Sequence, residues 1–162
     1  MEIKAKKIEK ELVSKIKPNP KNRNNHSKEQ IERLCKIIMY QGFRNPLIIS
    51  NRSGYLVAGH GRLLAAKELG IKEVPVIYQD FDDEDQEYTA AVSDNAISSW
   101  AELDLSGINA DIPELGPFDI DLLGIKDFTV VPEFEPGTLE DQGKLDEKKP
   151  VECPNCGHKF TT

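Results

Sequence analysis

Apolar and polar residues alternate along the first half of the chain in patterns that predict both strands and helices. Short runs dense in Val, Ile, Leu and Tyr predict strands at residues 46–50, 55–58 and 74–78. The four residues 51–54 between the first two runs end in glycine, which predicts a β-hairpin. Pro75 lacks an N–H, so we expect it at a sheet edge or at the start of its strand.

Helical periodicity marks two further segments. Ser27 followed three residues later by Gln30 is a capping-box pattern, and apolar side chains then recur at helical spacing (31, 34, 35 and 38) as far as Gly42. Residues 63–69 predict a second helix, and Gly70 stands where a helix C-terminus favours glycine.

A third helical pattern follows the last predicted strand. Acidic residues at 82–85 stand at its start, where the helix dipole favours negative charge, and apolar positions recur behind them on one face. Asp94 and Asn95 therefore lie inside this helix or near its end. We expect Trp100 and Leu103 to complete the core.

The two ends of the chain are more polar. Residues 1–12 are highly charged and predict a frayed arm or an exposed helix, and residues 13–16 predict a short extended piece. Glycine and proline recur after residue 104, which leaves 118–123 as a short element able to dock on the domain. Residues 129–150, rich in Pro, Glu, Asp, Lys and Gly, predict a flexible linker.

A glycine-containing loop joins the strand at 55–58 to the helix at 63–69. Its sequence is Gly59-His60-Gly61-Arg62. Glycines allow positive φ and close backbone approach, while the first N–H groups of the helix face the loop. Arg62 adds a charged planar fork, so the loop favours a phosphate ligand. A plain strand-to-helix turn with an exposed Arg is the alternative, because short glycine loops are weak signals.

Charge is distributed unevenly along the 162 residues, whose net charge is −7. Residues 1–44 carry 12 Lys and Arg against 5 Asp and Glu, whereas residues 80–162 carry 5 against 21. The basic part includes a Pro- and Asn-rich loop at 17–25 that can meet phosphates. Three interpretations remain open: nucleic acid bound by the basic part, an acidic tail folded back over it, or two merely solvated surfaces.

No apolar run approaches the roughly 18 residues that span a bilayer, and the N-terminus has no apolar signal-peptide core, so we expect a cytoplasmic protein. Cys35 lies on an apolar helical stripe and is expected in the core. Cys153 and Cys156 form a C-x-x-C motif, and His158 could add a third ligand of the four that structural zinc needs. Another group of the chain or a second protomer would complete such a site; an unmetallated remnant is the alternative.

Four motifs occur in a fixed order: Pro18-Asn19-Pro20, Gly42-Phe43 with Pro46-Leu47, the Ala58-to-Ala66 segment AGHGRLLAA, and Asp94-Asn95. On these motifs the chain resembles the ParB/sulfiredoxin superfamily, and more closely the ParB N-terminal-like proteins of phages and mobile elements. The resemblance covers about residues 10–125. It implies an α+β fold in which helices pack on a small mixed sheet. Composition and the C-x-x-C motif place an acidic linker (126–150) and a half zinc-ribbon tail (151–162) after this domain.

The resemblance also implies a nucleoside triphosphate, CTP or ATP, bound with Mg²⁺. The positions that match the family's nucleotide-binding segments are Asn19, Asn22, Arg23, Arg44, Gly59, His60, Gly61 and Arg62, and Asp94 with Asn95 match the pair that ligates Mg²⁺. His60 stands where sulfiredoxin carries its catalytic Cys, so that chemistry is not expected. Gly61 replaces one of two adjacent arginines of partition proteins, which leaves hydrolysis and the preferred base open. The Gly/Pro-broken stretch after residue 104 replaces a helix-turn-helix domain, so centromere-type readout is not expected.

Three functions follow. The first is a nucleotide-dependent switch or weak NTPase acting in phage or mobile-element DNA metabolism or modification. The second is a nuclease in which His60 and Asp94 are catalytic. The third is a non-enzymatic adaptor to a DNA-modifying enzyme. The expected partners are a nucleotide, DNA through the basic N-terminal half, a DNA methyltransferase or another phage protein, and a second copy of the chain.

Overall fold

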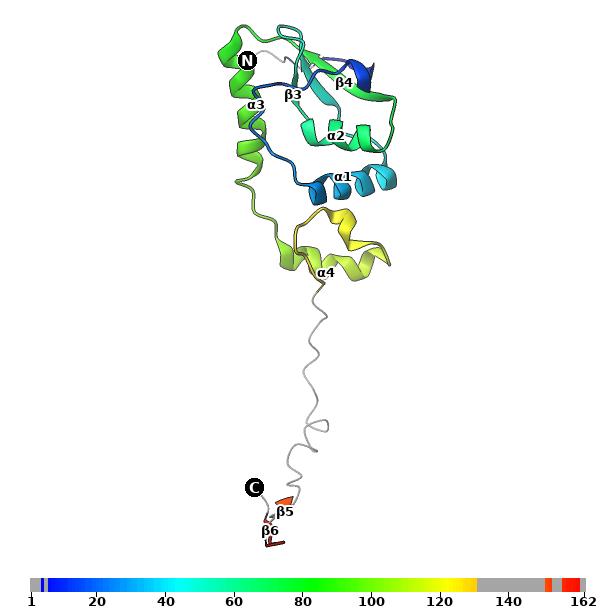
Figure 1. Cartoon of the computed structure of the whole chain (residues 1–162), viewed down its shortest axis with the longest axis vertical. Coiled ribbons are helices and arrows are strands. Elements are labelled where there is room, and N and C mark those ends of the chain that lie inside the picture. Colours follow the sequence, from blue (N-terminus) through cyan, green and yellow to red (C-terminus); the bar gives the residue numbers. More distant parts are fainter. Residues whose placement is uncertain (1–3, 5, 131–150, 153–155, 161–162) are drawn as a thin grey trace. The chain divides into compact units, whose positions relative to one another are not determined.

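The computed structural model describes residues 4, 6–130, 151–152 and 156–160, and it divides into two units, residues 1–129 and 130–162. The first unit holds a four-stranded sheet (Figure 1). Its strands are β1 (Ile8–Leu12), β2 (Leu47–Ser50), β3 (Leu56–Ala58) and β4 (Glu73–Gln79), in the order β1-β4-β2-β3. The pair β2 and β4 is parallel and the other two pairs are antiparallel, so the sheet is mixed, and the predicted hairpin is confirmed as β2–β3.

The strand β1 corrects the prediction of a frayed arm or exposed helix. It pairs with β4 along its whole length, from Ile8 opposite Ile77 to Leu12 opposite Glu73. A 3-10 turn, η1 (Val13–Lys15), then replaces the predicted extended piece. Because β4 has a partner on each side, Pro75 is not at a sheet edge. It is the third residue of β4 and precedes the part that pairs with β2, so its missing N–H breaks no bond to β2.

Two helices lie on one side of the sheet, with the second along the chain next to the strands and the first packed against the second (Figure 1). The first, α1 (Lys28–Gln41), begins as predicted: Ser27 Oγ accepts the Gln30 N–H at 3.1 Å. Gln30 does not return the bond of a full capping box, since its side chain contacts His26 Nδ1 at 3.0 Å. The second, α2 (His60–Glu68), begins three residues earlier than predicted, because Gly59 itself is the N-cap residue.

The core forms between the sheet and α2, with a smaller cluster between α2 and α1. The main cluster is made of nine buried side chains, Val13, Ile16, Leu47, Ile49, Leu56, Leu63, Ala66, Val74 and Val76. Ile31, Cys35 and Ala65 form the second cluster. Burial raises the pKa of the Cys35 thiol, which fits the predicted core role for this residue.

A third helix, α3 (Glu84–Ser98), packs beside β3 and carries Asp94 and Asn95 inside it, as predicted. Asp83 caps it by accepting the Gln86 N–H at 2.7 Å. Trp100 and Leu103 were expected in the core, and this was wrong: 78% and 62% of their surfaces are exposed. The chain leaves the sheet after α3, so no core lies within their reach.

The stretch after residue 104 contains a helix that the glycine and proline pattern did not predict. This helix, α4 (Leu105–Leu115), is capped by Asp104, whose Oδ1 accepts the Gly107 N–H at 2.9 Å, and Pro113 lies in its last turn. The predicted docking element is present as η2 (Ile120–Leu123), which packs against α1. Lys36 Nζ lies 2.7 Å from an Asp121 carboxylate oxygen across that contact.

In the second unit, β5 (Val151–Glu152) and β6 (Lys159–Phe160) pair antiparallel. Cys156 and His158 are exposed, whereas Cys153 and nearly all of the predicted linker lie outside the described residues. The zinc site therefore stays a prediction. None of the helices in the described part of the chain is long and apolar enough to span a membrane.

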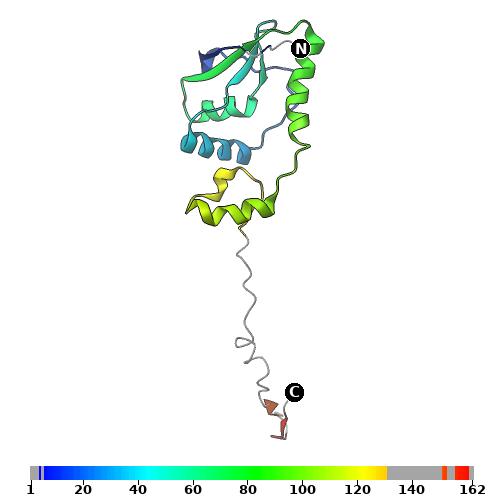
Figure 2. The same cartoon turned by 180° about the vertical axis from the view of Figure 1, so that it is seen from behind.

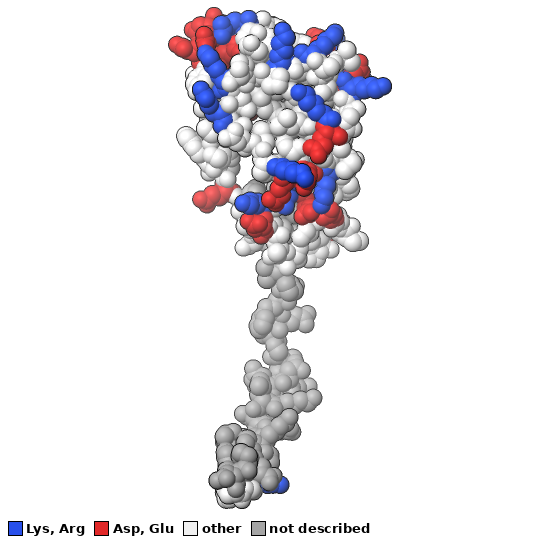
Figure 3. All heavy atoms as spheres, in the orientation of Figure 1, with Lys and Arg blue, Asp and Glu red and all other residues white. Residues whose placement is uncertain are grey.

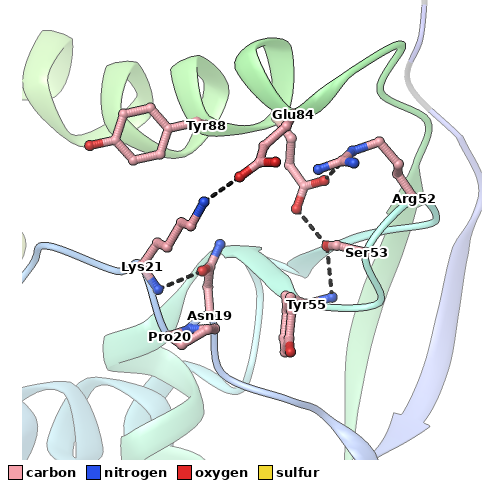
Figure 4. Close-up of a pocket in the computed structure, with 9 residues that line it drawn as sticks. Asn19, Pro20, Lys21, Arg52, Ser53, Tyr55, Glu84 and Tyr88 are labelled. Carbon is pink, nitrogen blue, oxygen red and sulfur yellow. Dashed lines mark hydrogen bonds and ion pairs between the residues drawn. The ribbon is translucent and has the colours of Figure 1, made fainter.

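A buried carboxylate fixes α3 to the β2–β3 hairpin. Glu87 is only 4% exposed and accepts hydrogen bonds from Ser50 Oγ at 2.9 Å, Ser53 Oγ at 2.5 Å and Arg52 Nε at 3.0 Å. Figure 4 shows two of the donors, Arg52 and Ser53. A buried carboxylate is tolerated when it is paired and hydrogen-bonded, and three donors meet that condition here.

Replacing Glu87 by Ala should lower the free energy of unfolding by about 2–3 kcal/mol, because two hydroxyls and a guanidinium lose their acceptor. Urea unfolding at neutral pH measures this. Asp85→Ala, two residues away on the exposed side of α3, is the matched control and should change stability by no more than about 0.5 kcal/mol. Equal effects of the two substitutions would contradict the anchoring role.

Candidate functional site

The segment 18–25, the start of α2 and one face of α3 enclose a groove. Figures 1 and 2 show this segment passing between α3 and α2 on its way to α1. A hollow of about 340 Å³ lies there, lined by Asn19, Lys21, Asn22, Arg23, Asn24, His60, Tyr88, Ala91, Val92, Asn95, Ala96 and Ser99. A second hollow of about 340 Å³ shares Asn19 and His60 with it. A third, of about 230 Å³, shares Asn19, Lys21 and Tyr88 (Figure 4). We call these adjoining hollows the Asn19 groove.

Gly59 determines how α2 meets the groove. Its φ is +100°, and a Cβ added there would lie 2.5 Å from Leu47 Cδ2 and 3.0 Å from Arg62 Nη2. Only glycine fits both the backbone conformation and this space. No side chain caps α2, so the N–H groups at its start keep their capacity to bind an anion.

Arg62 folds its guanidinium back over Gly59. Its Nε is buried and has no hydrogen-bond partner among the described residues. Burial lowers the pKa of Arg62, and the nearby charge of Asp94 acts in the opposite direction. A guanidinium with a buried, unpaired N–H stays charged at neutral pH and is costly until an acceptor reaches it. Arg62 itself lines none of the three hollows.

His60 holds the loop segment in place. The Asn19 N–H donates to His60 Nε2 at 3.3 Å, which requires an unprotonated Nε2. Burial, followed by the neighbouring charge of His26, lowers the pKa of His60. Gly61 allows the close approach of His26, because a Cβ there would lie 3.1 Å from His26 Cε1.

The loop is also ordered from within. Asn19 Oδ1 accepts the Lys21 N–H at 2.8 Å, and the Asn22 side chain bonds the backbone of Asn24 at 3.1 and 3.2 Å. Asn22 therefore shapes the loop. Arg23 differs, since it lines the groove, is exposed, and forms no hydrogen bond or ion pair with any described residue.

The metal-ligand pair proposed from the sequence lies on α3, and both residues are exposed. Asn95 lines the groove and donates its amide to the Ala91 carbonyl at 3.2 Å, which leaves Oδ1 as an acceptor. Asp94 does not line the hollows but is close enough to Arg62 to affect its pKa. Arg44 is bonded elsewhere. Its Nε donates to the Gln41 carbonyl at 2.9 Å, and Arg44 lines none of the three hollows.

Sequence analysis missed several groove residues. Tyr88 belongs to the face of α3 on which apolar positions recur in the sequence; 44% of it is exposed and it borders two hollows. The aromatic ring among small residues at 91 and 96 was the available signal. Lys21 and Asn24 belong to the basic, Asn-rich loop that the sequence indicated. The contact of Lys21 with α3 and the bond of Asn24 within the loop depend on the fold and could not be predicted.

Comparison with known proteins assigns the chain to a family. Residues 1–96 match the ParB N-terminal domain family. The ParB-like nuclease domain-containing protein YnaK of Escherichia coli K12 is 38% identical over 65 residues, which are 40% of this chain and 74% of YnaK. Uncharacterized protein ORF326b of Acidianus two-tailed virus is 43% identical over 60 residues, which are 37% of this chain and 18% of that protein.

A solved structure shares the fold. It is the C-terminally truncated chromosome-partitioning protein ParB from Caulobacter crescentus, complexed with CTP-γ-S, with a TM-score of 0.59 and 22% identity. The match covers 68% of this chain and 63% of that one, so this chain spans less than two thirds of the solved protein. At this identity the likeness establishes the α+β fold, with helices packed on a small mixed sheet.

The lowered pKa of His60 has a consequence for stability. Because the folded state binds the His60 proton less well than the unfolded state, stability should fall as pH drops from about 6.5 through the folded-state pKa. His60→Gln keeps an acceptor for the Asn19 N–H but cannot titrate, so it should lose less stability over this window. Urea unfolding at about pH 7.5 and 5.5 measures both proteins. The same loss in both would show that His60 is not the titrating group.

Proposed function

Because the chain belongs to the ParB N-terminal domain family, we propose that it binds a nucleoside triphosphate with Mg²⁺ in the Asn19 groove and acts as a nucleotide-dependent switch in the DNA metabolism of a phage or mobile element. One observation carries the proposal: Arg62 brings a buried guanidinium N–H with no acceptor to an uncapped helix N-terminus. The Caulobacter ParB complexed with CTP-γ-S supports the choice of ligand.

The phosphates bind where α2 begins. The N–H groups of His60, Gly61 and Arg62 precede the first backbone bond of the helix, which runs from the Leu63 N–H to the Gly59 carbonyl. These donors and the positive end of the helix dipole favour an anion. Arg62 then supplies a charge-assisted hydrogen bond, and Arg23, which lines the groove, supplies a second positive charge.

Asp94 and Asn95 would hold Mg²⁺ beside the phosphates. A carboxylate and an amide oxygen are hard donors, and Mg²⁺ commonly binds one or two carboxylates together with phosphate oxygens and waters. One carboxylate next to a phosphate site therefore fits the ion. When bound, Mg²⁺ would neutralise phosphate charge that Arg62 and Arg23 leave uncompensated.

The contacts of the loop favour a ligand-dependent switch as the function. Asn19 is tied to His60 by one hydrogen bond, so a ligand on the α2 start touches the residue that holds the loop. Binding can thus change the loop position and whatever surface it presents to a partner. The proposed partners are DNA through the basic N-terminal half, a DNA-modifying enzyme such as a methyltransferase, and a second copy of the chain. Weak hydrolysis, with His60 and Asp94 as the catalytic groups, belongs to the same proposal.

A nuclease is the second candidate, because the YnaK relative bears that name. The described part of the chain contains no group of three or more His, Cys, Asp and Glu side chains placed to hold a metal ion. A nuclease here would have to rely on His60, Asp94 and one ion. Cleavage of plasmid DNA that needs Mg²⁺ and is lost in both His60→Ala and Asp94→Ala would favour it over the switch.

Arg62→Ala should weaken triphosphate binding by about 1.5–3 kcal/mol, the range for a charge-assisted hydrogen bond. A thermal-shift screen of CTP, ATP and GTP with Mg²⁺ identifies the nucleotide, and calorimetry then measures its affinity. Arg44→Ala removes the same charge outside the groove and is the matched control, expected to change affinity little. A folded Arg62→Ala protein with wild-type affinity would remove Arg62 from the site.

Asp94→Ala and Asn95→Ala should each abolish most of the Mg²⁺ dependence of nucleotide binding and leave the fold intact, since both side chains are exposed. Calorimetric titrations with Mg²⁺ and with EDTA measure the dependence, and circular dichroism checks the fold. Unfolding without any change in metal dependence would instead assign the pair a structural role.

A further inference from the structure

Lys21 is tied to α3 by an ion pair that crosses the Asn19 groove. Its ammonium contacts the Glu84 carboxylate at the start of α3, and Figure 4 shows this contact spanning the space between the loop and the helix. The hydrogen bond to the partner is the main reason that the pKa of Lys21 is raised and that of Glu84 lowered. Lys21 lines two of the hollows that make up the groove.

The backbone of Lys21 is fixed, while its side chain is able to move. Asn19 Oδ1 accepts the Lys21 N–H at 2.8 Å, which fixes the Lys21 backbone beside the groove. The ammonium can still change its position by rotation of the side chain. Both members of the ion pair are 60% exposed. Exposed pairs of this kind contribute little to stability, so the bond exchanges readily for a better acceptor.

Glu84 keeps favourable surroundings when Lys21 leaves. It lies in the first turn of α3, where the helix dipole favours a carboxylate, and the Arg52 charge also lowers its pKa. Acidic side chains gather over this end of α3, at the upper left of Figure 3, with Lys and Arg side chains beside them. Glu84 therefore competes with any ligand for the Lys21 ammonium, and a ligand must bind that ammonium more strongly than Glu84 does.

We propose that Lys21 is a phosphate ligand of the groove that Glu84 withholds in the free protein, so that the pair selects nucleotides with several phosphates. The inference rests on the proposed nucleotide site at the start of α2. A triphosphate carries more negative charge than the single Glu84 carboxylate and extends farther from the Arg62 end. It draws the ammonium away, whereas a monophosphate bound at Arg62 leaves the Lys21–Glu84 contact in place. Release of Glu84 then frees the loop from α3.

A double-mutant cycle tests this. Calorimetry at low salt measures the affinities of CTP and ATP, each with Mg²⁺, for wild type, Lys21→Ala, Glu84→Gln and the double variant. Glu84→Gln should tighten triphosphate binding about two- to fivefold, the worth of an exposed ion pair. Lys21→Ala should weaken it about three- to tenfold. In the Lys21→Ala background, Glu84→Gln should have no further effect, because nothing remains for Glu84 to withhold.

Two controls make the result specific. Asp85→Asn removes the same charge one residue away without touching Lys21, and it should leave the affinity unchanged. Lys21→Ala should leave the affinity for CMP and AMP unchanged. Because it weakens triphosphate binding, the preference for triphosphates over monophosphates should become smaller. Equal tightening by Glu84→Gln with and without Lys21, or by Asp85→Asn, would overturn the inference. Wild-type protein that binds neither triphosphate would overturn the proposed function as well, so the two failures are distinguishable.

Discussion

The backbone conformation of Gly59 is the constraint on which the rest of the site depends. A positive φ lets the chain turn from β3 directly into α2, and the absence of a Cβ leaves room for the Leu47 side chain and the Arg62 guanidinium. A larger residue would push apart the sheet, the helix or both. The close turn is what places three backbone N–H groups, His60 and Arg62 together at the start of α2.

The other walls of the groove are fixed relative to that turn by polar contacts. Glu87 joins α3 to the β2–β3 hairpin, so the helix that carries Asp94, Asn95 and Tyr88 has a set position beside β3. The loop wall is held more weakly, by one hydrogen bond from Asn19 to His60 and one exposed ion pair. A rigid turn, a rigid helix and a lightly held loop are the combination that a ligand-dependent switch requires.

Sequence reasoning was most accurate where structure is decided by a few neighbouring residues. Ser27 as a cap and Gly42 as a helix end act within one turn, and each was found from local pattern alone. The strand β1 was missed because its sequence IEKEL has little apolar character, and its strand conformation comes from pairing with the distant β4. The helix α4 was missed for a different reason. Gly107 and Pro113 predict interruption, yet Asp104 caps the start and the proline falls in the last turn.

The candidate site shows the same division. The glycine loop and the Asn-rich loop were identified from residue types. That His60 would accept a bond from Asn19, and that Tyr88 would face the groove while Trp100 lies exposed beyond it, depends on where α3 lies. A pattern of apolar spacing tells which residues share a helix face and does not tell whether that face meets a core or a ligand site.

The central claim is that a nucleoside triphosphate binds at the start of α2, and backbone NMR tests it most directly. Amide signals of ¹⁵N-labelled full-length protein would be followed while Mg²⁺ and CTP, or ATP, are added. The account predicts that the largest shifts occur at the amides of His60, Gly61 and Arg62, with further shifts along 19–24 and at Asn95. Shifts confined to β1, α4 or the second unit, or none at millimolar nucleotide, would contradict it.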